Sequence, residues 1–469
     1  MDQVGDHDRS ADAPAHREQA CVTRTRAPRG MGSAFWTVWS AATISFVGNG
    51  LTIGAMPLLA LSVTTDPRLI AAVNAVLMAG WLLLGLVSGV VVDRSGRLRM
   101  MWWIDAARAL IMIGLTIAIV FSRVSVPVLL LLALLLGLAA PFFDNASSSV
   151  IPDLVSPRLL EKANSWTQVP LLLGAGLVGP PVGAALFSVF HEGPFLLDAV
   201  TFAGSALLLA RLATRHGNAR PAPVAPGPPE RPWPMLKEGL VYLTRHRTLR
   251  SLAVAVGMIN IVTGGVFAVL VIYTTQALHL PSHAYGWLIA VSALGGAIGS
   301  PLTPRIASRA GTRIAIIGSL MTFGIMASLL GAVPSLPIAI FMLAAGGFAS
   351  VVWNVVTISY RQRIVPGELL GRVNSSYRVI SFAGIPIGAI GAGVLTHAMG
   401  VAPTYLLGGT LLILAGLAVI PSLLPLPGPE AHSDQVRAVP QPPCQDRGEK
   451  GEMVAARSRS NSPGGSYPG

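Results

Sequence analysis

The segment "GVVVDRSGRLRM" (residues 89–100) joins two long apolar stretches, and it places one aspartate and three arginines within seven residues. Charged residues make up only 12% of this 469-residue chain, whereas about 25% is usual in soluble domains. Because charge is scarce elsewhere in the chain, the role of this charged segment has to be inferred from the apolar stretches that flank it.

These stretches have the length of membrane-spanning helices, because a helix needs roughly twenty predominantly apolar residues to cross the hydrocarbon core. Six such runs precede a polar stretch and six follow it. They cover residues 35–61, 69–92, 100–121, 126–150, 166–189, 194–212, 252–273, 285–302, 312–333, 336–359, 376–398 and 402–424. The sequence therefore predicts an all-α membrane protein with twelve transmembrane helices in two six-helix bundles.

The net charge of +12 is distributed unevenly between the two sets of connecting loops. If the amino terminus is cytosolic, the inside loops carry Arg94, Arg97, Arg99, Arg158, Lys162, Arg305, Arg309, Arg313, Arg361, Arg363 and Arg372. The outside loops carry only Arg68 and Arg123. This asymmetry follows the positive-inside rule. It predicts a multi-pass protein of the cytoplasmic membrane with both termini in the cytosol, in contact with lipid, and it argues against nucleic-acid binding.

Composition suggests five segments along the chain. Residues 1–33 and 425–469 are polar and are expected to be disordered cytosolic tails, and residues 34–213 and 251–424 are expected to form the two bundles. Residues 214–250 are expected to be a cytosolic linker that is first proline-rich and then forms a short amphipathic helix. The only cysteines, Cys21 and Cys444, lie in the tails, so no disulfide or thiolate metal site is expected in the core.

The two halves of the chain are related by a shift of 210 positions. "LLEKANS" (residues 159–165) falls on "LLGRVNS" (residues 369–375), Gly89 falls on Gly299, and Asp144 falls on Asn354. A constant offset through several loops and spans indicates a duplicated six-helix unit, as in many transporters.

Twelve spans in two repeated halves resemble the major facilitator superfamily, and the loop "GVVVDRSGRLR" resembles its signature after the second span. The segments "MMWWIDAARAL", "NASSSVIPDLVSPRLLEKANS" and "FLLDAVTF" resemble the drug-efflux branch that includes macrolide exporters and the enterobactin exporter. "GAGLVGPPVGAAL" in the fifth span resembles the glycine- and proline-containing motif of antiporters, through Gly179, Pro180 and Gly183, although Ala175 stands where that motif has a glycine.

The opening segment is interpreted as a gating latch at the cytosolic mouth, where the two halves meet and part. The residues assigned to it are Gly89, Asp93, Arg94, Gly96, Arg97 and Arg99. Asp93 is expected to face the positive amino-terminal end of a helix in the other half when that mouth is closed. The alternative is an ordinary inside loop, but the positive-inside rule alone does not call for Asp93.

Ionisable residues inside spans are costly in lipid and are functional candidates. Asp105, Arg108, Asp144 and Asp198 are the candidates here. Asp105 and Arg108 lie three residues apart and are expected to form an ion pair, with direct substrate contact as the alternative. Asp144 is expected to pair with Arg97, with proton carriage as the second interpretation. Asp198, without an obvious basic partner, is the candidate proton carrier, and an exposed interfacial carboxylate is the alternative.

Four further residues are candidates to line a central cavity: Asn49, Asn260, Asn354 and Trp353. For Asn49 and Asn260, hydrogen bonding to a neighbouring helix is the alternative role. Many relatives have an acidic residue in the first span where this chain has Asn49, so the resemblance leaves the coupling ion open.

The sequence contains no phosphate-binding loop motif, no metal-ligand spacing of His or Cys, and no paired nucleophile and base, so neither an enzyme nor a bound cofactor or metal is expected. We expect a monomeric secondary exporter of a small hydrophobic or amphipathic organic compound, such as an antibiotic, drug or siderophore-like molecule, driven by proton antiport. The alternatives are a metabolite importer of the same fold, a non-transporting membrane sensor and a lipid flippase.

Overall fold

The computed structural model describes residues 31–216 and 232–423, and within these ranges the chain is helical with no β-strand. Most of the two predicted tails and the proline-rich part of the predicted linker lie outside the described residues. The all-α fold follows from the sequence, because backbone groups in lipid must be satisfied within each segment, and a helix does this.

The first half of the chain forms six long helical segments. They are α1 (Ser33–Val63), α2 (Pro67–Arg94), α3 (Arg97–Val120), α4 (Val126–Leu154), a fifth composed of α5 (Leu160–Pro170), the π-helical η2 (Leu171–Val178) and α6 (Gly179–Val189), and α7 (Gly193–His216). A single turn, η1 (Pro157–Leu159), precedes α5. The turn between α1 and α2 is short because Asp66 caps α2 and Pro67 occupies its first position.

The second half begins with α8 (Pro232–Arg245), which lies in the segment assigned to the linker. The helices that follow are α9 (Arg247–Ala268), α10 (Leu270–Ile272), η3 (Tyr273–Ala277), α11 (Ala284–Ala332), α12 (Leu336–Ile364), α13 (Gly367–Met399) and α14 (Val401–Leu423). Ser376 on α13 donates a hydrogen bond to the carbonyl of Leu236 on α8 (2.9 Å), and Arg372 binds Glu238, so α8 is fixed against the start of α13.

Eleven helices among the described residues are long and apolar enough to cross a membrane. The longest, α11, has 49 residues and is interrupted at Gly311, whose φ of 79° and ψ of 161° are not helical. At ~1.5 Å per residue such a segment is about twice the length of one crossing. It therefore consists of two spans, as the sequence predicts, and the prediction of twelve spans is confirmed.

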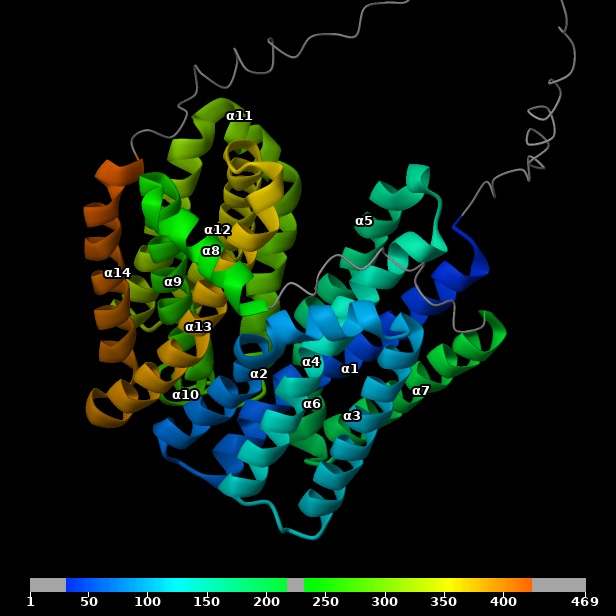
Figure 1. The fold of residues 1–469 in the computed structure, drawn as a ribbon. Helices are drawn as coiled ribbons and strands as arrows, with labels where there is room; N and C mark the ends of the chain where they lie inside the picture. The colour runs from blue at the N-terminus through cyan, green and yellow to red at the C-terminus, as the bar shows by residue number, and fades with distance from the viewer. Residues whose placement is uncertain (1–30, 217–231, 424–469) are drawn as a thin grey trace, which may run out of the picture.

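The spans form two bundles that lie side by side (Figure 1). Glycines allow close helix crossings within each bundle: a Cβ at Gly137 on α4 would lie 2.3 Å from the Leu77 carbonyl of α2. A Cβ at Gly347 on α12 would lie 1.8 Å from the Ser292 carbonyl of α11. Gly137 and Gly347 are 210 positions apart, so the repeated sequence produces the same helix crossing in both halves.

The two bundles touch at one end of the molecule. A Cβ at Gly393 on α13 would lie 2.7 Å from the Cβ of Ala71 on α2, and one at Gly286 on α11 would lie 2.4 Å from the Pro180 carbonyl of α6. We call this end, which carries Asp66 and His397, the closed end. The opposite end, which carries the turn in the middle of α11, the amino-terminal end of α1 and the carboxyl-terminal end of α14, is the open end (Figure 1).

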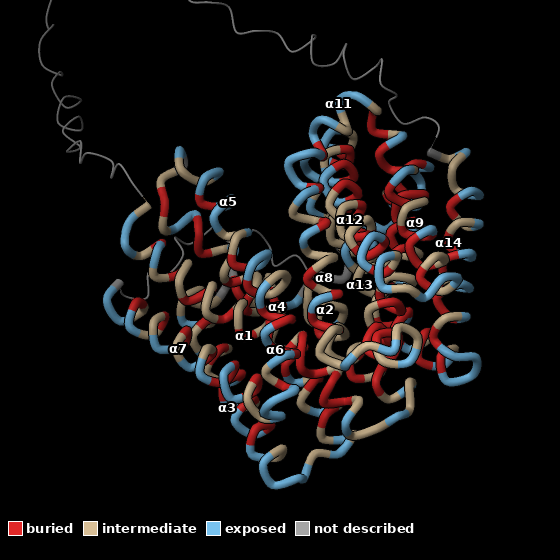
Figure 2. Tube along the Cα trace, turned by 180° about the vertical axis from the view of Figure 1, so that it is seen from behind, coloured by how far each residue is buried: buried red, intermediate tan, exposed pale blue. Residues whose placement is uncertain are grey.

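Buried residues follow the inner faces of both bundles, while the outward faces are largely exposed (Figure 2). The exposed residues of these faces include many large apolar side chains, among them Leu110, Phe121, Phe341 and Leu414. Apolar surface on this scale is expected where a protein contacts lipid.

Candidate functional site

A cluster of ionisable side chains lies inside the first bundle. Asp105 and Arg108 on α3 are both buried, and their Oδ1 and Nη1 atoms are 3.6 Å apart. Their spacing of three residues places them on the same face of the helix. Ser45 on α1 donates a hydrogen bond to Asp105 Oδ1 (3.4 Å), so the pair is held between α1 and α3.

Asp198 on α7 completes this cluster. Its Oδ2 atom accepts a hydrogen bond from Thr52 of α1 (2.6 Å), and its Oδ1 accepts one from Thr201 (3.2 Å). Gly48 on α1 makes room for the carboxylate, because a Cβ there would lie 2.1 Å from Asp198 Oδ1. The side chain is fully buried within the first bundle.

Arg108 is the cation shared by the cluster. Its charge interacts with the carboxylates of Asp105, Asp198 and Asp144, the last on α4. Its guanidinium also lies over the rings of Phe143 and Phe202, at 5.2 and 5.5 Å. Arg97, which the sequence pairs with Asp144, instead binds Asp153 on α4 (2.6 Å). Asp198, for which the sequence suggests no basic partner, makes its side-chain hydrogen bonds with the hydroxyl groups of Thr52 and Thr201.

A cavity of about 1010 Å³ lies between the bundles. The second bundle supplies most of its walls, from α9, α11, α12 and α13, and the first bundle contributes α5 and η2. The lining combines aromatic and aliphatic side chains with uncharged polar ones. None of the lining residues is charged within the described part of the chain. The polar and aromatic lining residues are Gln168, Asn260, Thr263, Phe267, Ser292, Ser300, Phe323, Ser350, Trp353, Asn354, Ser381 and Phe382.

Three of the four cavity candidates line this space, namely Asn260, Asn354 and Trp353. Asn260 both lines the cavity and bonds to a neighbouring helix, because its Nδ2 donates a hydrogen bond to the Ser381 carbonyl of α13 (2.8 Å). Asn49 is not among the lining residues. Its neighbours explain this: Gly48 packs on Asp198 and Gly50 packs on Gly179, so this turn of α1 lies against α7 and α6.

The glycine and proline residues of the fifth span form its contact with α1. A Cβ at Gly179 would lie 2.4 Å from the Gly50 Cα, and one at Gly183 would lie 2.2 Å from the Leu51 carbonyl. Pro180 also touches the second bundle, through Gly286 of α11. The motif therefore lies where the first bundle meets the second at the closed end.

The loop assigned to the latch joins α2 to α3 at the open end. α2 ends at Arg94, Gly96 precedes the first turn of α3, and Arg97 and Arg99 lie in that turn. A Cβ added at Gly89 would meet nothing within 4 Å, so no helix of the second bundle packs there in this state. The side chains of Asp93 and Arg94 lie outside the described part, and the latch contact remains a prediction.

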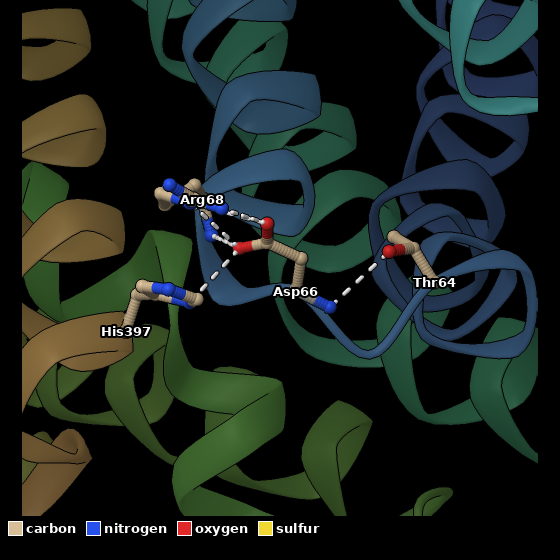
Figure 3. Close-up of polar contacts among 4 residues, drawn as sticks. All are labelled: Thr64, Asp66, Arg68 and His397. Atoms are coloured by element: carbon tan, nitrogen blue, oxygen red, sulfur yellow. Dashed lines mark hydrogen bonds and ion pairs between the residues drawn. The ribbon is translucent and has the colours of Figure 1, made fainter.

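The structure contains two contacts between the bundles that the sequence did not predict. The first lies at the closed end, where Asp66 binds His397 of α13 (3.5 Å). Asp66 also binds Arg68 of α2 (2.7 Å) and accepts a hydrogen bond from the backbone N–H of Arg68 (Figure 3). The hydrogen bonds from Arg68 lower the pKa of Asp66 to about 2. The second contact lies further along the α2–α13 interface, where the rings of Trp81 and Phe382 stack with their centroids 5.2 Å apart.

Comparison with known proteins agrees with this architecture. A family model described as transmembrane secretion effector, of the major facilitator type, matches residues 26–452. The chain is 26% identical over 437 residues to the multidrug efflux pump Tap of Mycobacterium bovis, covering 86% of this chain and 97% of that protein. It is also 26% identical over 359 residues to the enterobactin exporter EntS of Shigella boydii, covering 76% and 83%.

Solved structures of similar fold include a bacterial homologue of the iron transporter ferroportin in an inward-facing state, with a TM-score of 0.64 and 17% identity over 82% of this chain and 98% of that one. A bacterial homologue of the lysosomal transporter Spinster, inward-facing and unoccupied, gives a TM-score of 0.62 and 15% identity over 83% and 96%. Since the family model covers nearly the whole chain, this protein belongs to the transmembrane secretion effector family of the major facilitator superfamily of membrane transporters.

Proposed function

We propose that this protein is a secondary active exporter of small hydrophobic or amphipathic organic compounds, driven by proton antiport and working by alternating access. One observation supports it above the others. The ionisable cluster lies inside the first bundle, whereas the large cavity is lined mainly by uncharged residues of the second. The proposed proton-binding residues and the proposed substrate cavity therefore lie in different parts of the molecule.

The cluster has the composition that proton exchange requires. It holds three carboxylates, those of Asp105, Asp144 and Asp198, and one guanidinium, that of Arg108. One cation does not neutralise three carboxylates, of which Asp105 and Asp198 are buried and Asp144 is half-buried. Uncompensated charge is costly away from water. Taking up and releasing a proton is the ordinary way for such a site to balance its charge. Asp198 is our choice of carrier because Thr52 ties it directly to α1.

The cavity favours the exporter over the metabolite importer of the same fold. An importer of sugars or polar metabolites needs many charged and amide side chains to replace water around its substrate. Here the lining has three amide side chains, Gln168, Asn260 and Asn354, and is otherwise apolar, aromatic or hydroxyl-bearing. This suits a compound that is mostly apolar and has a few hydrogen-bonding groups.

The positive-inside rule places the open end of the molecule in the cytosol, since most loop arginines lie there. In this orientation the cavity is reached from the cytosol, and the contacts at the closed end shut it from the outside. A substrate would then enter from the cytosol or the inner leaflet, and export would require the closed end to open.

Transport into everted membrane vesicles tests this function. With an acid-interior pH gradient and no ATP, vesicles that contain the protein should accumulate the uncharged amphipathic dye Nile red, and nigericin should abolish the accumulation. Asp198→Asn should lose gradient-driven accumulation but keep dye exchange under counterflow conditions. The matched control is Glu161→Gln, an exposed carboxylate on α5. Gradient-independent accumulation, or net uptake by intact cells, would overturn the proposal.

A further inference from the structure

Arg378 extends the wall of the cavity toward the open end. On α13 the cavity is lined by Ser381, Phe382 and Ile385. Arg378 precedes them by three, four and seven residues, which are the spacings that keep side chains on one face of a helix. It is exposed, and it is the first charged residue that a ligand on this face would meet beyond the uncharged lining.

The internal repeat of 210 residues also places Arg378 at the cavity or its mouth. A shift of 210 positions takes Arg378 to Gln168, and Gln168 lines the cavity from α5 on the other side. The equivalent positions of the two halves therefore both contribute to the cavity or its mouth, one with an amide and the other with a cation.

The guanidinium of Arg378 is held by aromatic rings and not by a carboxylate. Its Cζ lies 5.7 Å from the ring centroid of Trp81 on α2 and 5.8 Å from that of Phe382. These two rings stack on each other across the two bundles. Within the described residues Arg378 has no acidic partner, so its hydrogen-bonding groups remain available to a ligand. Cation–π contacts keep a guanidinium in place without using its N–H donors.

We propose that Arg378, Trp81 and Phe382 form a subsite that recognises an acidic, aromatic substrate, with the anionic group on Arg378 and the planar ring against the two aromatic side chains. This inference rests on the proposed export function and narrows its substrate class. A planar guanidinium binds a carboxylate or a similar anion through two parallel hydrogen bonds. The described lining offers no carboxylate for a cationic drug, so the charge at the cavity selects for anions.

Two xanthene dyes of similar shape and opposite charge, fluorescein and rhodamine 123, provide the test. Binding to the full chain in phosphatidylcholine nanodiscs is measured by fluorescence anisotropy. We expect fluorescein to bind more tightly than rhodamine 123, and Arg378→Gln to weaken fluorescein at least about tenfold, since hydrogen bonds to charged groups contribute about 1.5–3 kcal/mol. Arg378→Lys should give an intermediate loss and Trp81→Leu a smaller one.

Arg363→Gln is the matched control, because Arg363 is an exposed arginine on α12 that lies nine residues from Asn354 and thus on the opposite face of the helix. The inference is overturned if wild type does not bind fluorescein, or if Arg378→Gln binds it within twofold of wild type. It is also overturned if phosphatidylglycerol abolishes fluorescein binding, because Arg378 would then be a site for lipid headgroups.

The two proposals can fail separately. If vesicles export rhodamine 123 but neither bind nor export fluorescein, the exporter stands and the acidic subsite is wrong. If fluorescein binding depends on Arg378 but neither dye is transported along a proton gradient, the subsite stands and proton-driven export is wrong.

Discussion

The Nδ1 atom of His397 lies 3.5 Å from the Oδ1 atom of Asp66, and this contact joins the last turn of α13 to the residue that caps α2 (Figure 3). It bridges the two bundles at the closed end. Hydrogen bonds from Arg68 lower the pKa of Asp66 from 3.8 to about 2. Asp66 is thus ionised above about pH 4 and carries the negative charge of this contact.

Removing the charge of Asp66 should loosen this end of the molecule. Asp66→Asn keeps the size of the side chain but deletes its attraction to Arg68 and His397. Spin labels at Arg123 and Val333, exposed positions on opposite bundles at this end, should show longer electron–electron distances in Asp66→Asn than in wild type. The population should shift severalfold at most, because solvent weakens exposed ion pairs.

His397→Gln should lengthen the distances in the same direction, and His283→Gln, at the same end, should leave them as in wild type. If Asp66→Asn and His397→Gln both keep the wild-type distances, the contact between Asp66 and His397 does not control the closed end.

Arg108→Gln should destabilise the protein more than Asp105→Asn does. Removing the shared cation leaves buried carboxylates without compensation, and breaking a buried ion pair in this way costs about 3–5 kcal/mol. Asp105→Asn removes one of the carboxylates and keeps a polar group of the same size beside Ser45. Thermal unfolding in detergent measures the order. Arg363→Gln, an exposed control, should change little; equal melting temperatures for Arg108→Gln and Arg363→Gln would contradict the cluster.

The sequence predicted the fold well because its main signals are local or periodic. Span length, loop charge and the 210-residue repeat can each be recognised in the sequence without knowledge of the tertiary arrangement. The boundary at Gly311 is an example: the apolar runs on either side predict two spans, although the backbone continues as one helical stretch interrupted by a single residue.

The site was harder to predict because the position of a residue along a helix does not show which neighbouring helix its side chain faces. Asp198 and Arg108 lie on α7 and α3, ninety positions apart, and nothing in the sequence indicates that these helices face each other. Asn49 has the right depth for the cavity, but its turn of α1 packs against other helices of its own bundle. The contact of Asp66 with His397 joins residues from different halves of the chain, and neither residue belongs to a motif.

Gly286→Leu should force the closed end apart. The added side chain would meet the Pro180 carbonyl, since even a Cβ would lie 2.4 Å from it, and overpacking of this kind costs about 1–3 kcal/mol. The same spin-label pair should report a longer distance, and the milder Gly286→Ala should shift it in the same direction if Gly286→Leu does not fold. Gly318→Leu is the control, because a Cβ at Gly318 would meet nothing within 4 Å. An unchanged distance in both Gly286 variants would contradict the proposed packing.

Gly89→Leu should leave folding intact but impair transport. In this state a Cβ at Gly89 would meet nothing within 4 Å, so the variant should fold and bind substrate as wild type does. The latch interpretation requires the bundles to meet near this loop when the open end closes, and a leucine would then obstruct them because packed interfaces tolerate little added volume. Transport should therefore fall sharply, and spin labels at Ser95 and Ser308 should lose their short-distance population. Gly204→Leu, on α7 with equal space around it, is the matched control. Wild-type transport by Gly89→Leu, with the short distances retained, would show that the helices never meet at this loop and that its charges only orient the chain in the membrane.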